Sequence, residues 1–459
     1  MMFSVGSVNK RIIAISIVLF VHACVIAQQY QPTWQSLDQR AIPEWYGNAK
    51  FGIFIHWGLY SVPAWATNSN ADGFGSNYAE WYWQRLNAPK LKIHKEFVAF
   101  HERVYGKNFK YQDFAQRFTC EMFDPQQWAK IIKSSGAKYV VLTSKHHEGF
   151  TLWPSKESWN WNAMDLGPHR DLAGDLAKAI KDAGLHMGFY YSLYEWYNPI
   201  YKDSVNEYVT DRMIPQLKDL VNRYNPDVLW ADGDWEHSDT IWKSREFLAW
   251  LFNSSAVKNS IVTNDRWGGG KGHGGFITSE YSKGKSALSK PWEETRGIGE
   301  SFGYNRNESL EQYASSEKLV HQLIDVVSRG GNLLLNIGPS ADGLIPVIMQ
   351  QRLKDIGDWL HVNGEAIYET TAWKDAPANK PQDIFFTRKG KDLYIITAKW
   401  EDEIAIENIT KAAGISMLGV PGSLHFKKKG NKLVIASPEI NPGNMPCAYA
   451  WVYKISGAF

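Results

Sequence analysis

The sequence predicts an α/β protein in which a (β/α)8 TIM-like barrel is followed by a C-terminal antiparallel β-sandwich. The chain has 459 residues, 44% of them hydrophobic, which is enough for a barrel of ~250 residues and a smaller module. Between residues 50 and 340, short β-branched and aromatic runs alternate with helical stretches, as expected for parallel strands. After Tyr368, short strands follow one another with no helical pattern between them, which is typical of a sandwich.

Residues 1–27 have the composition of a secretory signal peptide. Lys10 and Arg11 precede an apolar run, Ile12–Ala27, that is shorter than the ~20 residues of a membrane span. A signal anchor and a lipoprotein acceptor at Cys24 stay open as alternatives. Removal of this segment takes away two of the 50 basic residues and none of the 48 acidic ones. We therefore expect a mature protein without net charge that is secreted or periplasmic.

The barrel is expected to occupy residues 28–368. Asp124 can cap a helix that begins at Pro125, Gly136 can end it, and a strand follows. A doubly wound open sheet shows the same alternation of helices and strands, and periodicity alone does not separate the two folds. The strands expected in this region are 51–57, 138–143, 186–192, 227–232, 260–266, 276–281 and 332–337.

The β-sandwich is expected to occupy residues 369–459, with strands at 383–388, 392–397 and 432–436 joined by glycine-containing turns. Eighteen of the 21 Trp residues lie before residue 366, so the aromatic surplus belongs to the barrel. Trp supplies flat apolar faces that suit a protein core and also sugar rings. Only three Cys are present, which rules out a disulfide framework and leaves the pairing of Cys120 with Cys447 open.

Titratable and aromatic side chains gather where the predicted strands end, which is the face of a barrel that carries chemistry. Strand alternation places Trp230 and Asp232 on one face and Leu229 and Ala231 on the other. We expect Trp230 and Asp232 to point into the barrel. Burial of a carboxylate there costs free energy, so Asp232 is expected to have either a catalytic role or an ion-pair partner. Ion pairing of Asp232 with Arg266 is the structural alternative. The strand-end groups are His56, Trp57, His146, His147, Glu148, Tyr190, Tyr191, Trp230, Asp232, Asn264, Asp265, Arg266, Glu280 and Tyr281.

Other chemistries find little support in the sequence. His146 and His147 are adjacent, but neither HExxH nor CxxC spacing occurs, which disfavours a metal site. The chain has no Gly-x-Ser-x-Gly elbow and no basic run that would suggest nucleic-acid binding. Carboxylates, histidines, one Arg and many aromatic rings remain. This set fits glycoside hydrolysis, which uses a pair of carboxyl groups together with polar and aromatic contacts to the sugar.

An ordered series of motifs between about residue 32 and residue 370 resembles the α-L-fucosidases of glycoside hydrolase family 29. The resemblance implies a retaining exo-hydrolase that removes terminal α-L-fucose from glycans or fucosides, without a metal or an organic cofactor. It also implies that a β-module follows the barrel. The motifs are His56-Trp57-Gly58, Ala79-Glu80-Trp81-Tyr82, Lys145-His146-His147-Glu148-Gly149-Phe150, Leu229-Trp230-Ala231-Asp232-Gly233, Asn264-Asp265-Arg266-Trp267, Trp292-Glu293-Glu294-Thr295-Arg296-Gly297, Ser301-Phe302-Gly303-Tyr304 and the run 330–339.

Carried over residue by residue, the resemblance assigns the nucleophile to Asp232. It assigns the acid/base to Glu280 of the motif Thr278-Ser279-Glu280-Tyr281 and, in human-type members, to the position of Glu293. Ser279 departs from the Ala found in the bacterial motif. The resemblance implies that the following residues contact fucose or the nucleophile: His56, Glu80, Trp81, His146, His147, Tyr190, Trp230, Arg266 and Phe302.

The hypothesis is a double displacement in which Asp232 attacks the anomeric carbon and Glu280 first donates and then accepts a proton. We expect Arg266 to keep Asp232 ionised, and Phe302 and a Trp to cover the sugar methyl group. Trp57 is expected beside the catalytic groups. A fucosylated oligosaccharide or glycoconjugate is the expected partner, while nucleic acid and a membrane beyond the signal peptide are not. Another retaining barrel glycosidase of galactoside type, a non-catalytic glycan-binding relative and a metal-dependent hydrolase are the alternatives.

Overall fold

The computed structural model describes residue 1 and residues 29–282, 290–377, 379–409 and 411–459. The expected signal peptide, except for its first residue, lies outside the described residues. Within the described part of the chain, no helix combines the length and the apolar character that crossing a membrane requires.

The barrel contains eight parallel strands in the order β5-β4-β3-β2-β1-β8-β7-β6. Its two ends meet through an isolated parallel bridge between Asn264 and Phe276, just beyond β5 and just before β6. The expected barrel is therefore confirmed over the open doubly wound sheet. The strands are β1 Phe51–Ile55, β2 Tyr139–Lys145, β3 His186–Ser192, β4 Val228–Asp232, β5 Val262–Thr263, β6 Ile277–Glu280, β7 Trp292–Gly297 and β8 Asn332–Ile337.

Strand β7 is the one barrel strand that the sequence pattern does not predict. Its run Trp-Glu-Glu-Thr-Arg-Gly looks polar, yet Glu293 and Glu294 are both buried. Each carboxylate accepts hydrogen bonds inside the protein, Glu293 from Tyr46 and Glu294 from the backbone of Ser282. These hydrogen bonds compensate the cost of burying the two carboxylates, so a strand of low hydropathy can form part of the barrel. A hydropathy pattern therefore does not detect strand β7.

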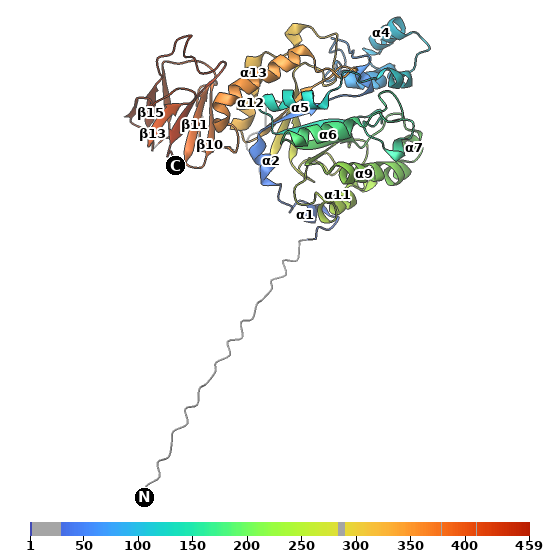
Figure 1. Cartoon of the computed structure of the whole chain (residues 1–459), viewed down its shortest axis with the longest axis horizontal. Helices are drawn as coiled ribbons and strands as arrows, with labels where there is room; N and C mark the ends of the chain where they lie inside the picture. The colour runs from blue at the N-terminus through green and yellow to red at the C-terminus, as the bar shows by residue number, and fades with distance from the viewer. Residues whose placement is uncertain (2–28, 283–289, 378, 410) are drawn as a thin grey trace.

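Helices surround the barrel (Figure 1), and α5 begins where the sequence signals indicate. The Asp124 side chain accepts hydrogen bonds from the first amides of α5, and Pro125 occupies the first turn. The helices are α1 Trp34–Leu37, α2 Glu44–Ala49, α3 Tyr82–Leu86, α4 His94–Tyr105, α5 Pro125–Ser134, α6 Leu172–Asp182, α7 Pro199–Asp203, α8 Val205–Tyr208, α9 Ile214–Tyr224, α10 Asp239–Trp242, α11 Ser244–Asn253, α12 Ser316–Ser328 and α13 Val347–Asn363.

The barrel strands separate two hydrophobic clusters. Trp230 belongs to the inner cluster with Phe54 and Tyr190, whereas Leu229 and Ala231 belong to the outer cluster beneath the helices. The alternation predicted for β4 is thereby confirmed. It brings Trp230 and Asp232 to the interior at the carboxyl end of the barrel.

The C-terminal region forms two antiparallel sheets, with strand orders β13-β16-β11-β10-β9 and β12-β15-β14. Alternate side chains of both sheets share one hydrophobic cluster, as in a β-sandwich. The strands are β9 Thr371–Ala372, β10 Ile384–Lys389, β11 Asp392–Thr397, β12 Glu403–Glu407, β13 Gly414–Met417, β14 Phe426–Lys429, β15 Lys432–Ala436 and β16 Trp451–Ser456.

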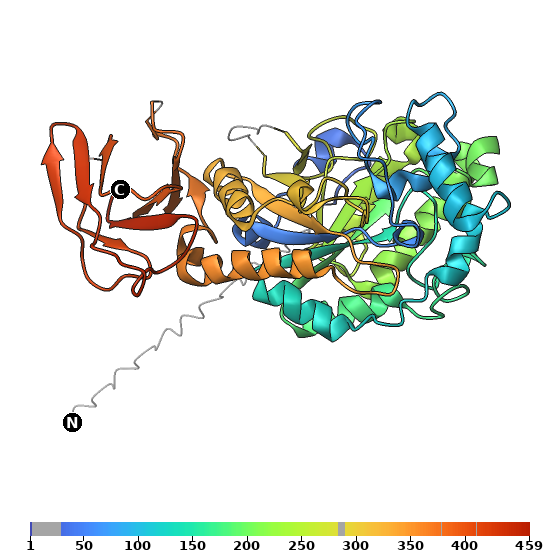
Figure 2. The ribbon, with the colours of Figure 1, turned by 90° about the horizontal axis from the view of Figure 1, so that it is seen from above.

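The sandwich lies beside helices α12 and α13 of the barrel in both views (Figures 1 and 2). His321 on α12 bonds to the carbonyl oxygen of Tyr449 at 2.8 Å, and Trp359 on α13 donates to that of Ala450 at 2.9 Å. Cys120 and Cys447 are both free thiols.

Candidate active site

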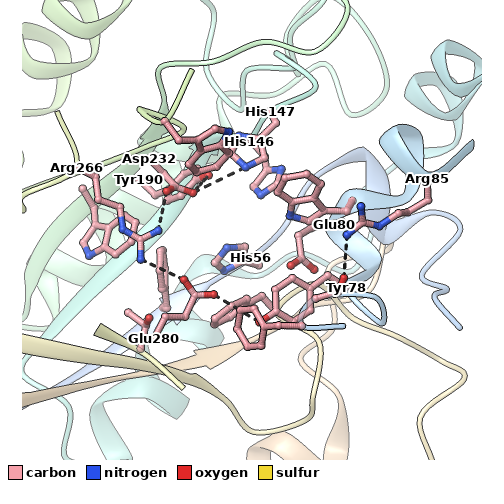
Figure 3. A pocket seen from close by; sticks show the side chains of 18 residues that line it. His56, Tyr78, Glu80, Arg85, His146, His147, Tyr190, Asp232, Arg266 and Glu280 are labelled. Carbon is pink, nitrogen blue, oxygen red and sulfur yellow. Dashed lines mark hydrogen bonds and ion pairs between the residues drawn. The ribbon is translucent and has the colours of Figure 1, made fainter. Parts of the chain in front are cut away.

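A cavity of about 260 Å³ opens at the carboxyl ends of the barrel strands (Figure 3). We call it the central cavity. Every residue to which the resemblance assigns a contact or a catalytic role lines it, except Glu293, the expected alternative acid/base; Trp57, expected beside these groups, does not line it either. The lining residues are Phe54, His56, Phe74, Gly75, Tyr78, Glu80, Trp81, Arg85, His146, His147, Tyr190, Trp230, Asp232, Trp235, Arg266, Glu280, Thr295 and Phe302.

Asp232 is the last residue of β4 and receives donors from two neighbouring strand ends. Tyr190 Oη on β3 donates to Asp232 Oδ2 at 2.8 Å, and Arg266 Nη1 donates to Oδ1 at 2.7 Å. The side chain keeps only 12% of its surface exposed, towards the cavity. These charge-assisted hydrogen bonds fix the orientation of the carboxylate.

Arg266 joins the two carboxyl groups of the cavity (Figure 3). Its Nη2 lies 3.1 Å from Glu280 Oε2, while its plane covers the ring of Trp230 with Cζ 4.7 Å from the ring centroid. Burial works against the charged form, but the carboxylates of Asp232 and Glu280 raise the pKa of Arg266 above its ordinary value. A permanent cation thus holds Asp232 and Glu280 in one cluster.

Glu280 ends strand β6 on the opposite side of Arg266 from Asp232 (Figure 3). Burial raises the pKa of its carboxyl group, Arg266 opposes that rise, and the charge of Asp232 adds to it. Tyr78 Oη, on the adjoining wall, lies 3.5 Å from Glu280 Oε1. Glu280 is therefore a carboxyl group that holds a proton more readily than a solvated one and that faces the cavity.

Glu293 lies beneath the cavity and does not line it. Its carboxylate accepts hydrogen bonds from Tyr46 at 2.9 Å, Tyr139 at 2.5 Å and Trp230 at 2.9 Å. Burial raises the pKa of Glu293 to about 7, although these three donors oppose the rise. The acceptor sites of this group are taken by the barrel interior, and Trp230 stands between it and the cavity.

His56 presents a defined hydrogen-bonding face. Asn336 Nδ2 donates to the carbonyl oxygen of Phe302, so its Oδ1 accepts from His56 Nδ1 at 2.7 Å. Burial, together with neighbouring His146, lowers the pKa of His56 well below its ordinary value, so the ring is neutral. Its Nε2 is consequently a hydrogen-bond acceptor.

His147, on the other side of the cavity, also presents a defined hydrogen-bonding face. Ser192 donates its hydroxyl to the carbonyl oxygen of Tyr194 and accepts from His147 Nδ1 at 2.6 Å. Burial and the nearby His146 lower the pKa of His147 well below its ordinary value. The unprotonated Nε2 faces Asp232 Oδ2 at 3.8 Å, so two acceptors lie side by side. A hydroxyl group of a ligand is the donor that such a pair can share.

Glu80 and Trp81 come from a short 3-10 helix, η2 Ala79–Trp81, which forms the wall across the cavity from Arg266. Glu80 Oε2 accepts the amide of Gly303 at 2.8 Å, and burial raises the pKa of this carboxyl group. Trp81 packs at the edge of His147, with ring centroids 5.2 Å apart. Phe302 stacks on His56 with ring centroids 4.9 Å apart.

Trp57 does not lie where it is expected. Although it follows His56 directly, its ring turns outward and packs against Phe118, Phe123 and Trp128, and its Nε1 donates to the carbonyl oxygen of Ser340. Neighbouring residues of an extended chain point in opposite directions, so the presence of His56 in the cavity sends Trp57 to the core.

The structure adds lining residues that the sequence analysis does not single out. Phe74, Tyr78 and Arg85 come from the long connection after β1, and Trp235 comes from the loop after Asp232. Phe74 and Trp235 expose 71% and 53% of their surface. The Asp-Gly-Asp-Trp run at 232–235 is the one sequence signal that could have placed Trp235 near Asp232. Across the described ranges, no group of three or more His, Cys, Asp or Glu is arranged to hold a metal ion.

Comparisons with known proteins find relatives that match most of the chain. A family model described as alpha-L-fucosidase matches residues 17–365, and one described as alpha-L-fucosidase C-terminal domain matches residues 378–456. The chain is 44% identical to the alpha-L-fucosidase of Branchiostoma floridae, over 94% of this chain and 96% of that protein. It is 42% identical to the human tissue alpha-L-fucosidase, over 94% and 92%. The Thermotoga maritima alpha-fucosidase in complex with fucose superposes with a TM-score of 0.79 at 40% identity, covering 93% of this chain and all of that one.

Proposed function

The chain belongs to the α-L-fucosidase family of glycoside hydrolases, and we propose that it releases terminal α-L-fucose with retention of configuration. In this proposal Asp232 is the nucleophile and Glu280 is the acid/base. The observation that carries it is the shared guanidinium: Arg266 lies 2.7 Å from one carboxylate and 3.1 Å from the other. Two carboxyl groups that bind one planar cation lie close together, as in a retaining pair, whose carboxyl groups are ~5–5.5 Å apart.

In the first step, ionised Asp232 attacks the anomeric carbon while protonated Glu280 donates to the glycosidic oxygen. The C–O bond to the leaving group breaks, an ester bond to Asp232 forms, and the leaving group departs with the proton. In the second step, Glu280 takes a proton from water, which attacks the same carbon and frees Asp232. The raised pKa of Glu280 supports its starting proton. The hydrogen bonds from Tyr190 and Arg266 hold the carboxylate of Asp232 in one orientation.

Glu280 is a better candidate than Glu293 for the acid/base. A proton donor must reach the glycosidic oxygen within hydrogen-bond distance or through one water molecule. Glu280 lines the cavity, whereas Glu293 accepts three hydrogen bonds beneath it. We propose that Glu293 positions Trp230, whose ring packs against the guanidinium of Arg266. In this arrangement Glu293 acts through its neighbours and does not touch substrate.

Recognition of fucose is proposed to rest on the acceptors and aromatic rings of the central cavity. The neutral rings of His56 and His147 each leave one nitrogen to accept a sugar hydroxyl. Glu80, His146 and Tyr190 complete the polar surface. Phe302 and Trp230 offer the apolar faces that a C5 methyl group needs. An analogue without one hydroxyl would leave a buried acceptor unpaired and would be rejected.

We also propose that the protein is exported. The sequence of residues 1–27 supports this proposal, as do relatives named plasma α-L-fucosidase from rat and human. We further propose that the chain is divided into a barrel domain, residues 28–368, and a β-sandwich domain, residues 369–459, because the two family models match 17–365 and 378–456.

The proposed substrate of the protein is a fucosylated oligosaccharide or glycoconjugate. The proposal includes no nucleic-acid partner and no cofactor.

Time-resolved NMR of an aryl α-L-fucoside tests the mechanism directly. Retention requires that α-L-fucose is the first product and that the β-anomer appears later through mutarotation. If β-L-fucose is released first, the reaction inverts configuration and the double displacement is wrong. Aryl glycosides of other sugars serve as controls for the α-L-fucoside specificity.

A further inference from the structure

A second and larger cavity adjoins the first. It has a volume of about 750 Å³, nearly three times the 260 Å³ of the central cavity, and the two share Phe74, Gly75 and Tyr78 as a wall. We call it the side cavity. Its lining also includes Tyr281, Arg296, Glu300, Glu311, Lys318 and Gln322.

The proposed acid/base stands at the border between the two cavities. Glu280 lines the central cavity, and the next residue, Tyr281, lines the side cavity. Tyr78, which lines both, holds its hydroxyl 3.5 Å from Glu280 Oε1. Since the acid must contact the glycosidic oxygen, the leaving group begins where Glu280 lies. Its next atoms are therefore close to the shared wall.

The side cavity has the chemistry of a sugar site. Amide and hydroxyl side chains dominate its polar surface, and its two cations, Arg296 and Lys318, are balanced by Glu300 and Glu311. Phe74 offers an open aromatic face with 71% of its surface exposed. Gln322 Oε1 is buried and accepts no hydrogen bond from the described residues.

We propose that the side cavity binds the leaving group as a neutral oligosaccharide of two or more sugar units, stacked first on Phe74. This inference rests on the proposed role of Glu280 and extends it to substrate choice. The volume admits more than one ring, the balanced charges give no preference for an acidic glycan, and Gln322 supplies an unused acceptor for a hydroxyl. Fucosides of longer neutral glycans are therefore the preferred substrates.

The rim of the central cavity opposite the side cavity is the alternative place for the leaving group. Trp235 is also an exposed ring on the central cavity, and it stacks parallel to Trp81 with ring centroids 6.4 Å apart. It lies after β4, on the loop that follows Asp232, and it does not line the side cavity. Trp235 thus provides a matched aromatic control for Phe74.

The test compares kcat/KM for a neutral fucosylated tetrasaccharide with that for α-L-fucosyl fluoride, whose leaving group is one atom. We expect Phe74→Ala to lower the tetrasaccharide-to-fluoride ratio about 10-fold and Gln322→Leu to lower it roughly 5-fold. Trp235→Ala should leave the ratio within about twofold of the wild type. Fluoride hydrolysis also reports that each variant is folded.

A ratio unchanged in both Phe74→Ala and Gln322→Leu would overturn the inference. So would a selective fall in Trp235→Ala alone, which would direct the leaving group to the other rim. A wild-type ratio no higher than that for a fucosylated disaccharide would refute the preference for longer glycans. Failure of the wild type to hydrolyse fucosyl fluoride would instead contradict the proposed function.

Discussion

Arg266 Nη1 lies 2.7 Å from Asp232 Oδ1, across the gap between the ends of β5 and β4. From the sequence, this ion pair is the structural alternative to a catalytic role for Asp232. In the structure the pair lines the cavity, and the same guanidinium reaches Glu280, so pairing and catalysis do not compete. Arg266 fixes the relative position of the two carboxyl groups on which the proposed mechanism depends.

Replacement of Arg266 by Lys tests the shared guanidinium. A single ammonium cannot reproduce two parallel contacts to two carboxylates, so one charge-assisted hydrogen bond is lost. At about 1.5–3 kcal/mol, this loss lowers kcat/KM on an aryl α-L-fucoside roughly 10- to 100-fold. Steady-state kinetics measures the change, and circular dichroism confirms the fold. Wild-type kinetics in Arg266→Lys would show that the bridge is dispensable.

The variants Glu280→Ala and Glu293→Gln distinguish the proposed acid/base from the proposed positioning residue. With an activated aryl leaving group, Glu280→Ala should retain much of its fucosylation rate but lose deglycosylation, and azide should restore turnover. Glu293→Gln should lose activity through Trp230 and Arg266, by a similar factor for good and poor leaving groups, and azide should not help. Rescue of Glu293→Gln alone would exchange the two roles.

The pH profile reports the proton on Glu280. Because burial raises the pKa of this carboxyl group, it stays protonated to higher pH than a solvated Glu. kcat/KM should fall as the pH rises through that pKa, about tenfold per pH unit, because the deprotonated form cannot donate. Glu280→Ala, assayed with an activated substrate, should lack this alkaline limb. An unchanged alkaline limb in that variant would assign it to another group.

Glu293 makes stability depend on pH. Its pKa of about 7 in the folded state exceeds the ordinary value of 4.5, so the folded chain binds the extra proton between these values. Stability is therefore lost as pH rises from 4.5 to 7, by about 3 kcal/mol from this group. Glu293→Gln lacks this loss, so its free energy of unfolding relative to wild type should improve by that amount between pH 4.5 and 7.5. Urea denaturation at both pH values measures it, and an unchanged difference would contradict the assignment.

The sequence predicts the groups whose position follows from strand geometry. Alternation along β4 is sufficient to place Trp230 and Asp232 inside and Leu229 and Ala231 outside. The same rule, applied one residue further along β1, would have sent Trp57 to the core opposite His56. Strand β7 is not predicted because the buried carboxylates of Glu293 and Glu294 accept hydrogen bonds within the protein. A hydropathy pattern does not reveal such hydrogen bonds.

A different reason explains why the sequence does not predict the cavity walls that come from loops. Phe74 and Trp235 reach the cavity through the paths of two irregular segments, which depend on packing against distant parts of the chain. Phe74 contacts Tyr281 from strand β6's end, some 200 residues later, with ring centroids 5.8 Å apart. No local sequence signal indicates this contact, so the proposed leaving-group site can be recognised only in the folded chain.

Asp232→Gly with azide tests the proposed nucleophile most directly. Without the carboxylate, the fucosyl-enzyme cannot form, and kcat on an aryl α-L-fucoside should fall by at least ~10⁴-fold. Azide fits the space left by the side chain and should restore part of the rate by forming β-L-fucosyl azide in one displacement. Near-wild-type turnover of Asp232→Gly, or a restored rate that yields α-L-fucosyl azide, would contradict the assignment of Asp232.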